Sequence, residues 1–423
     1  MLTTRRNFLK AVAGAGAAAG TRLGTPPAFA QQRPVKMGVI VARSGVMATV
    51  GEGGLHGVQW GVDRINKAGG LLGRKIELIV EEETSPKETT ERFRKLALQD
   101  KVDVVSGAVS TGSGLALGPA AEELKMLWLS HDATTQKGVD ETMPKPKYSF
   151  RSTDNECETV MASLLTVKHW RGKIKTVGGI NLDYSYGRNN WEAFLTIMKK
   201  YNMDVTPVVD LWVPIGTIDL TSHVAALKQK KPDVIFATLL FAEVPIFFKQ
   251  AQAAGLTEGT KFVLPAAGFQ HTAMKKAFTP EGILLGHNSM YFEAPNASPL
   301  LKEFVKDYYE KYKDYPHFES DRAYATVAAY KAGVEKASKA IGGKWPSTDQ
   351  IIQALEGLEV ETLGGPFRYR EDHIPDCNFY EGFTTAKNKY DFLTIDPVEI
   401  MYTTKLQKPP GWKFYDWIAS WKV

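Results

Sequence analysis

Val35-Lys36-Met37-Gly38-Val39-Ile40-Val41 decides the fold class, because this short stretch is almost entirely apolar and the periodicity changes directly after it. A short apolar run of this length predicts a strand that is buried on both faces. Small and apolar residues then recur at helical spacing, at Gly57, Val58, Gly61, Val62 and Ile65. The stretch therefore begins a strand-and-helix pair.

The same alternation repeats along the chain. We expect further strands at 75–81, 102–106, 126–130, 174–180, 205–211, 233–238, 261–264 and 282–287. Segments of helical length lie between them, at 86–99, 156–170, 188–201, 219–230 and 244–254. Alternation of this kind predicts an α/β protein with parallel sheets covered by helices on both faces. The number of strands favours two doubly wound sheets, and one closed barrel is the alternative.

The later part of the chain has a different pattern. Residues 298–357 should be mostly helical, and short strands rich in Tyr and Phe should follow Gly364-Gly365-Pro366. With 423 residues the chain has room for about two domains.

Charge argues against a nucleic-acid partner. Of the 52 basic residues, four lie in the first thirty positions, which contain no acid, so the remainder has 48 basic against 47 acidic residues. A surface that binds phosphates needs a basic stripe. A body with a net charge of +1 does not predict one.

The first thirty residues have the pattern of an export signal. Arg5-Arg6 precedes an Ala/Gly-rich run at 11–20, and Ala28-Phe29-Ala30 follows. This predicts a twin-arginine signal that is cleaved after Ala30, and hence a periplasmic protein. A membrane anchor is the alternative, but the run is short and weakly apolar for a span. Two cysteines, Cys157 and Cys377, are too few for a disulfide framework, and the sequence leaves open whether they form one bridge.

Four loops after predicted strands are rich in hydroxyl groups, at 43–45, 107–114, 130–135 and 183–187. In open parallel sheets, ligands bind at the carboxyl ends of the strands. Short hydroxyls beside the N–H groups of a helix start can bind a carboxylate. Simple N-capping is the alternative for any one loop, but four loops in matching positions favour one shared polar cleft.

Catalytic and cofactor motifs are incomplete. The segment 51–56 resembles a dinucleotide loop, but His56 stands where the third glycine belongs. Gly112-Ser113-Gly114 lacks the spacing of a nucleophile elbow, and the eight histidines have no spacing typical of metal ligands. His131 beside Asp132 could be half of a catalytic dyad, although a cap or a ligand contact is favoured. We therefore expect no catalytic residue, no cofactor and no metal.

Several segments together resemble one known family. They are Gly38 to Gly45, Gly51, Gly57, Ile65-Asn66, Gly69-Gly70, Gly73-Arg74, Pro86, Gly107 with Ser110-Thr111, Ser130 with Ala133-Thr134, Phe150-Arg151, Tyr186-Gly187, Pro232-Asp233-Val234 and 252–256. The set resembles the branched-chain amino acid binding proteins, which are periplasmic receptors of ABC importers with the type I periplasmic-binding fold. The resemblance extends over nearly the whole chain after the signal.

That resemblance implies two lobes joined by three crossing segments near Arg151, His287 and Leu363. Lobe 1 would comprise residues 31–151 and 287–362, and lobe 2 residues 152–286 and 363–423. A ligand between hinged lobes is enclosed by domain closure.

The resemblance also implies where the ligand binds. A ligand carboxylate would contact Ser110, Thr111 and Thr134, and Tyr186 would close over it from lobe 2. The full set of expected ligand-binding residues is Ser44, Ser110, Thr111, Ser113, Asp132, Ala133, Thr134, Arg151, Tyr184, Tyr186, Phe241 and Phe269.

One position departs from the family pattern. Relatives bind the ligand ammonium partly through an acid of lobe 2, but the matching stretch Pro265-Ala266-Ala267-Gly268-Phe269 contains none. Either Asp132 supplies this charge from lobe 1, or the ligand has no ammonium. Trp212, Phe241 and Phe269 indicate an apolar or aromatic side-chain pocket, with core packing as the alternative.

The sequence thus predicts a periplasmic receptor that binds an amino acid or a related small carboxylate, which could be aromatic, in the cleft between the lobes. Its partner would be an ABC permease in the inner membrane, and we expect a monomer. A sensor of amides or urea with the same fold is one alternative. A secreted α/β hydrolase is the other, and it would need a nucleophile with a base.

Overall fold

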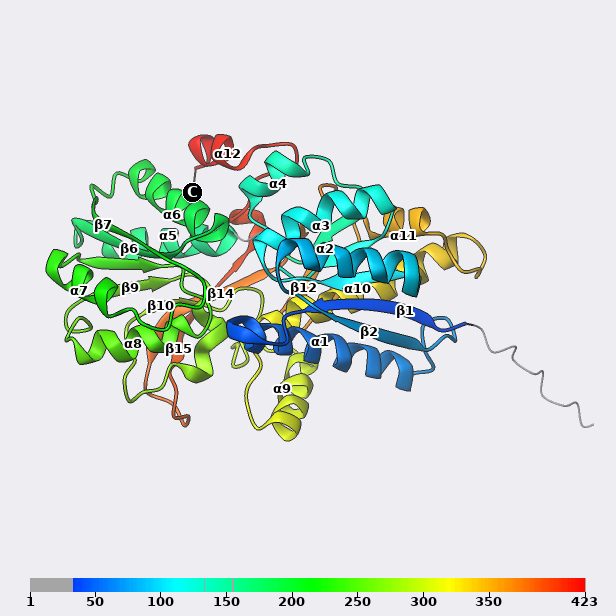
Figure 1. Ribbon diagram of the computed structural model, residues 1–423, viewed down its shortest axis with the longest axis horizontal. Helices are drawn as coiled ribbons and strands as arrows, with labels where there is room; N and C mark the ends of the chain where they lie inside the picture. The colour runs from blue at the N-terminus through cyan, green and yellow to red at the C-terminus, as the bar shows by residue number, and fades with distance from the viewer. Residues whose placement is uncertain (1–32, 133, 154–155, 423) are drawn as a thin grey trace, which may run out of the picture. The chain divides into compact units, whose positions relative to one another are not determined.

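The computed structural model describes residues 33–132, 134–153 and 156–422. The predicted export signal and Ala133 lie outside the described residues. Two separate open sheets account for most of the strands (Figure 1). The alternative of one closed barrel is therefore wrong, and the expectation of two α/β bodies is confirmed.

The first sheet is entirely parallel, with the order β2-β1-β3-β4-β5. Its central strands are buried, and Met37, Val39, Ile40 and Val41 are inaccessible to solvent. The strands are β1 (Val35–Val41), β2 (Ile76–Glu82), β3 (Val104–Gly107), β4 (Trp128–Ser130) and β5 (Ser149–Arg151). The helices between them are α1 (Ala48–Lys67), α2 (Pro86–Lys95), α3 (Thr111–Leu124) and α4 (Gln136–Thr142).

The second sheet has the order β15-β14-β10-β9-β8-β6-β7. Its strands are β6 (Thr176–Leu182), β7 (Thr206–Val213), β8 (Val234–Ala237), β9 (Lys261–Leu264), β10 (Leu284–Gly286), β14 (Asn378–Thr385) and β15 (Thr394–Tyr402). The first five are parallel, but β14 pairs antiparallel with both β10 and β15. The expectation of a purely parallel sheet is wrong at this edge, because β14 and β15 are joined by a short loop, which permits only an antiparallel pair.

Helices cover this sheet as the alternation predicts. They are α5 (Glu156–Trp170), α6 (Ser185–Lys200), α7 (Thr221–Lys230) and α8 (Glu243–Ala253). The predicted bounds of β9 and α5 agree with the structure to the residue. Helix α3 is not among the predicted helices because its first turn, Thr111-Gly112-Ser113-Gly114, is typical of a loop, and α4 is not because it has only 7 residues.

The last third of the chain packs a helix beside the first sheet and adds strands to the second. Helices α9 (Pro299–Tyr312), α10 (Glu319–Ala340) and α11 (Thr348–Leu355) come first, then a small antiparallel sheet, and then β14, β15 and α12 (Phe414–Ser420). The small sheet consists of β11 (Glu359–Thr362), β12 (Gly365–Tyr369) and β13 (Pro375–Asp376). Helix α10 packs along α1 beside the first sheet, whereas β14 and β15 complete the second.

Two further expectations concern cysteine and membrane segments. Cys157 and Cys377 are both buried as thiols in the structure, and burial raises the pKa of Cys377. Among the helices of the described residues, none combines the length and apolar character that a membrane crossing requires.

Close packing of α1 on α10 depends on glycine. A Cβ atom added at Gly57 would lie 2.1 Å from the backbone oxygen of Ser320, and the Ser320 hydroxyl donates a 2.9 Å hydrogen bond to the carbonyl of Gly53. Backbone atoms at this contact cannot move away as a flexible side chain could. The two helices can approach this closely because both α1 positions lack a side chain.

We expect Gly57→Ala to lower the free energy of unfolding by about 1–3 kcal/mol, the usual cost of overpacking. This loss opposes the gain of about 0.5–1 kcal/mol that alanine normally brings inside a helix. Urea denaturation measures the difference. Glu52→Ala, at an exposed position of the same helix, is the control and should not destabilise the protein. Equal stability of Gly57→Ala and wild type would contradict the packing argument.

Candidate functional site

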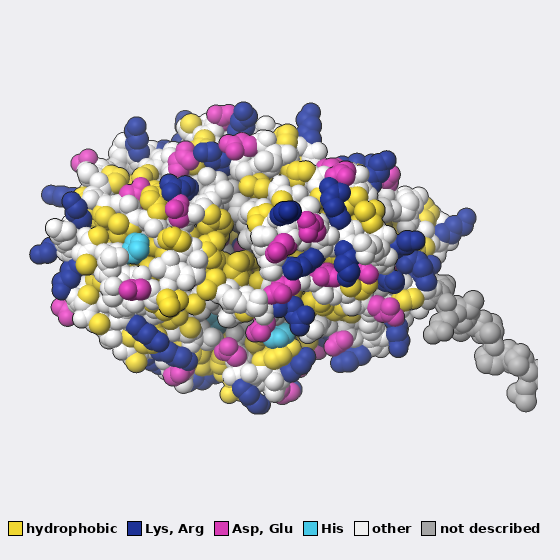
Figure 2. Space-filling model, viewed as in Figure 1, with side chains coloured by type: hydrophobic (Ala, Val, Ile, Leu, Met, Phe, Trp, Pro, Cys, Tyr) yellow, Lys and Arg dark blue, Asp and Glu magenta, His cyan; other side chains and the backbone are white. Residues whose placement is uncertain are grey.

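A small cavity lies where the carboxyl ends of strands from both sheets face each other. From the first sheet come Val109, Ser110, Thr111 and Asp132, and from the second come Glu158, Tyr184, Tyr186, Leu240, Phe241, Ala266 and Phe269. The cavity has a volume of about 10 Å³, room for roughly one water molecule. Figure 2 shows a narrow furrow bordered by hydrophobic side chains in the middle of the face in view. A larger ligand can enter only if the two sides separate.

Seven of the twelve predicted residues line this cavity. They are Ser110, Thr111, Asp132, Tyr184, Tyr186, Phe241 and Phe269. They come from loops after β3, β4, β6, β8 and β9, as the rule for open parallel sheets predicts. Phe241 and Phe269 are 1% and 3% exposed, so they pack in the core and also form the cavity wall.

Four predicted residues lie outside the lining and serve local structure. The Ser44 hydroxyl donates to Glu82 at 2.5 Å, and Ser113 receives a 2.9 Å hydrogen bond from the Ser110 hydroxyl. Arg151 donates to the backbone oxygen of Thr134 at 3.2 Å and to its hydroxyl at 3.3 Å. Any ligand contact by these four stays a prediction, as does that of Ala133.

Carboxylates of the chain itself occupy the backbone N–H groups that we expected a ligand to use. The N–H groups of Val109 and Ser110 donate to Glu83 at 2.8 and 2.9 Å. At the start of α4, the N–H group of Gln136 donates to Glu156 at 2.5 Å. Burial raises the pKa of Glu83, although these hydrogen bonds oppose the rise. Besides Asp132, the polar residues that line the cavity from the first sheet are Ser110 and Thr111, which carry hydroxyl groups.

Asp132 is paired with a buried cation. Its Oδ2 lies 2.5 Å from Nη1 of Arg322, and the exposed fractions of the two side chains are 11% and 0%. The guanidinium also stands 4.7 Å from the ring centre of Phe318. The charge of Asp132 is thus already neutralised by Arg322. This ion pair argues against the prediction that Asp132 offers its charge to a ligand ammonium. The sequence analysis missed the pair because it did not place α10 next to Asp132.

Glu158 is a lining residue that the sequence analysis missed. Its Oε1 accepts a hydrogen bond from the Tyr186 hydroxyl, and its Oε2 accepts a 2.7 Å hydrogen bond from the Asn288 amide. Burial raises the pKa of Glu158 to about 8, helped by Asp132 and opposed by Arg322. The carboxyl group is therefore mostly protonated at neutral pH. A signal was present, since the predicted helix 156–170 begins soon after Arg151, at the edge where the other site loops lie.

A second polar cluster lies behind the cavity. His131 contacts the Ser106 hydroxyl at 2.8 Å through Nε2 and Glu319 at 3.4 Å through Nδ1. This order of groups is that of a hydrolase triad, but all three side chains are fully buried and the Ser106 hydroxyl also bonds to Thr326 at 2.7 Å. Burial lowers the pKa of His131 to about 3. The cluster has no opening through which a substrate could reach the hydroxyl.

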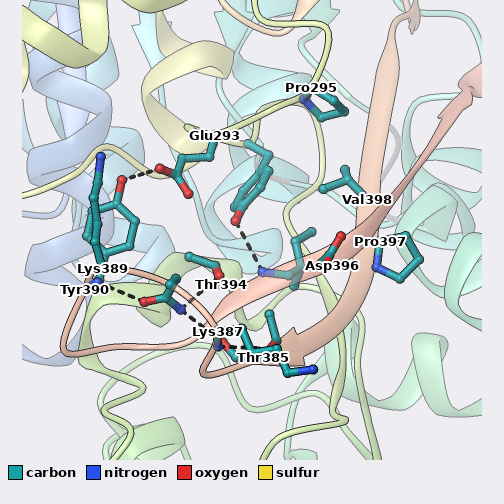
Figure 3. Close-up of a pocket in the computed structure, with 13 residues that line it drawn as sticks. Glu293, Pro295, Thr385, Lys387, Lys389, Tyr390, Thr394, Asp396, Pro397 and Val398 are labelled. Atoms are coloured by element: carbon teal, nitrogen blue, oxygen red, sulfur yellow. Dashed lines mark hydrogen bonds between the residues drawn. The ribbon is translucent and has the colours of Figure 1, made fainter.

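Among the described residues, no group of His, Cys, Asp or Glu side chains is arranged to hold a metal ion. An open hollow of about 620 Å³ lies beside the loop between β14 and β15, and Figure 3 shows its polar side chains bonded to one another, such as Tyr390 to Glu293. None of the predicted site residues lines it.

A family model described as "Periplasmic binding protein" matches residues 34–383. The curated relatives include a Leu/Ile/Val-binding protein homolog 7 of Brucella melitensis, 22% identical over 366 residues, which are 83% of this chain and 88% of the relative. A homolog 8 of Brucella suis is 24% identical over 360 residues, or 82% and 85%.

Solved structures share the fold. A solute-binding protein of an ABC transporter from Rhodopseudomonas palustris, in complex with 3,4-dihydroxybenzoic acid, has a TM-score of 0.76 and 23% identity, covering 89% of this chain and 99% of that one. One from R. palustris in complex with benzoate has a TM-score of 0.74 and 22% identity, covering 87% and 97%. A branched-chain amino acid transporter protein of Streptococcus pneumoniae in complex with isoleucine has a TM-score of 0.70 and 20% identity, covering 87% and 99%.

We expect Asp132→Asn to lower the free energy of unfolding by about 3–5 kcal/mol, because it leaves the buried Arg322 charge uncompensated. Thermal and urea unfolding in the absence of ligand measure the loss. The control is Glu123→Gln, which breaks the exposed ion pair with Arg94 and should change stability little. If both variants lose the same small amount, Asp132 does not neutralise Arg322 in the way the structure indicates.

Proposed function

Because the chain belongs to the periplasmic binding protein family, we propose that it is the solute receptor of an ABC importer and that its ligand is a small carboxylate with an aromatic body. The observation that carries this proposal is that residues predicted from both sheets line one enclosed cavity. Groups that face each other across two bodies can surround a ligand when the bodies close. This is the geometry of a receptor that binds and releases without chemical change.

The chemistry of the lining supports an aromatic body. Phe241, Phe269 and Leu240 supply an apolar wall, against which an arene can pack at favourable ring distances. The hydroxyls of Thr111, Tyr184 and Tyr186 face the same cavity and are suitable hydrogen-bond partners for a carboxylate. The relatives solved with 3,4-dihydroxybenzoic acid and benzoate support the same ligand class.

The charges of the lining argue against an ammonium group on the ligand. Asp132 is paired with Arg322, and Glu158 keeps its proton at neutral pH because burial raises its pKa to about 8. A buried ammonium needs an anionic partner, since an unpaired charge there costs several kcal/mol. Among the described lining residues, the protonated Glu158 and the paired Asp132 would both be poor partners for a ligand ammonium. An amino acid is therefore the second choice of ligand.

The lobes of this receptor would be residues 31–151 with 287–362 and residues 152–286 with 363–423, hinged near Arg151, His287 and Leu363. A cavity with room for only one water molecule corresponds to a closed arrangement of these lobes. Opening would admit the ligand, and the closed, loaded monomer would dock on an ABC permease in the inner membrane. The twin-arginine signal, cleaved after Ala30, would bring the chain to the periplasm.

We expect benzoate and hydroxybenzoates to raise the melting temperature of the mature protein, with leucine and isoleucine giving a smaller shift or none. A ligand that binds only the folded state stabilises it by about 2.7 kcal/mol at 100 times its dissociation constant. Phe269→Ala should weaken calorimetric binding, whereas Tyr309→Ala, at an aromatic residue outside the cavity that is 43% exposed, should not. Tight binding of leucine with no effect of benzoates would contradict the proposed ligand class.

We expect the double change Arg5→Lys with Arg6→Lys to retain the precursor in the cytoplasm, because Arg5-Arg6 is the paired arginine ahead of the apolar run. Cell fractionation followed by immunoblotting measures the retained precursor. Lys10→Arg, which conserves the charge outside the pair, is the matched control and should be exported. Normal export of the double variant would show that the chain does not use the twin-arginine route.

A further inference from the structure

We propose that Glu158 determines which ligand charge the cleft accepts: by holding a proton between its Oε1 and the Tyr186 oxygen, it makes the Tyr186 hydroxyl a hydrogen-bond donor to an anionic ligand group. This inference rests on the proposed function, since it assigns a specificity-determining residue to the same cavity. It concerns a residue that the sequence analysis did not select.

The hydrogen-bond geometry carries the argument. The Asn288 amide donates to Oε2 of Glu158 at 2.7 Å, so the acid proton belongs on the other oxygen, Oε1. Oε1 in turn accepts the hydrogen of the Tyr186 hydroxyl in the structure, and a proton on Oε1 would turn this bond around. Both Glu158 and Tyr186 line the cavity. When Oε1 carries the proton, it donates to the tyrosine oxygen, and the hydrogen of Tyr186 is free to turn into the cavity.

When Glu158 loses its proton, the Tyr186 hydroxyl no longer donates into the cavity. An ionised Glu158 accepts the hydrogen of Tyr186, and the tyrosine then presents only lone pairs to the cavity. Lone pairs and a negative charge repel a carboxylate, whereas they attract a cation. The same two side chains therefore favour an anionic ligand in one protonation state and a cationic ligand in the other.

Charged groups on neighbouring elements shift the pKa of Glu158, and the charge of Glu158 in turn shifts the pKa values of others. Arg322 of α10 lowers the pKa of Glu158, and Asp132, after β4, raises it. From β14, the buried carboxyl of Glu381 interacts with Glu158, and its own pKa is raised by burial. The charge of Glu158 also raises the pKa of Tyr184, before α6. Because Arg322 and Asp132 form a pair, burial dominates and Glu158 holds its proton to about pH 8.

The test uses benzoate as the probe, titrated calorimetrically from about pH 6 to about pH 9.5, a range in which benzoate is ionised throughout. For wild type, affinity should fall with rising pH, by up to tenfold per pH unit where the free receptor has lost the Glu158 proton that the complex keeps. Glu158→Gln should flatten this profile, because the amide cannot ionise. Tyr186→Phe should bind weakly at all pH values. Glu123→Gln is the control, an exposed acid outside the lining, and should follow wild type.

An unchanged slope in Glu158→Gln, or affinity that rises with pH in wild type, would overturn the inference while leaving a carboxylate receptor in place. Failure of benzoate, hydroxybenzoates and amino acids to bind any variant at any pH would instead refute the proposed function. A second measurement does not depend on ligand. The infrared difference spectrum of wild type minus Glu158→Gln at pH 7 should contain the carbonyl band of a protonated carboxyl, and its absence would also overturn the inference.

Discussion

The ion pair between the buried Arg322 guanidinium and Asp132 is the interaction on which the charges around the cavity depend. The guanidinium reaches from α10 to Asp132 at 2.5 Å and acts on the pKa values of Glu158, Glu319 and Asp321. Burial raises the pKa of each of these three acids. A single cation can neutralise only one anion, and the raised pKa values of the other three acids favour their neutral forms. An uncompensated buried charge would cost several kcal/mol.

Internal pairing of charges also occurs in the loops around the cavity. Helix starts and turns that present N–H groups attract anions, and here Glu83 and Glu156 satisfy those groups from within the protein. The ligand is left with hydroxyl groups and aromatic walls. Recognition by hydroxyls gives direction without adding a net charge, which suits a site that must also release its ligand to a partner.

Closure explains why polar residues lie in so small a cavity. Ser110 and Thr111 come from one sheet and Tyr184 and Tyr186 from the other, so each side presents hydroxyls to the other with room for about one water molecule between them. A hinge that separates the sides exposes those hydroxyls to solvent and to ligand. A polar lining of this kind is what the proposed receptor, which opens to admit its ligand and closes around it, requires.

The sequence by itself determined the strand-and-helix alternation, the loops of the site and seven of the residues that line it, because these depend on local periodicity and on the rule that parallel strands end at one edge. Only the tertiary structure decided the partners of those residues. It places Arg322, nearly 200 positions away in the chain, against Asp132, and it directs Glu158 toward Tyr186 and Asn288. Charge compensation acts between side chains that are close in space, and one-dimensional patterns contain no distances between segments so far apart in the chain.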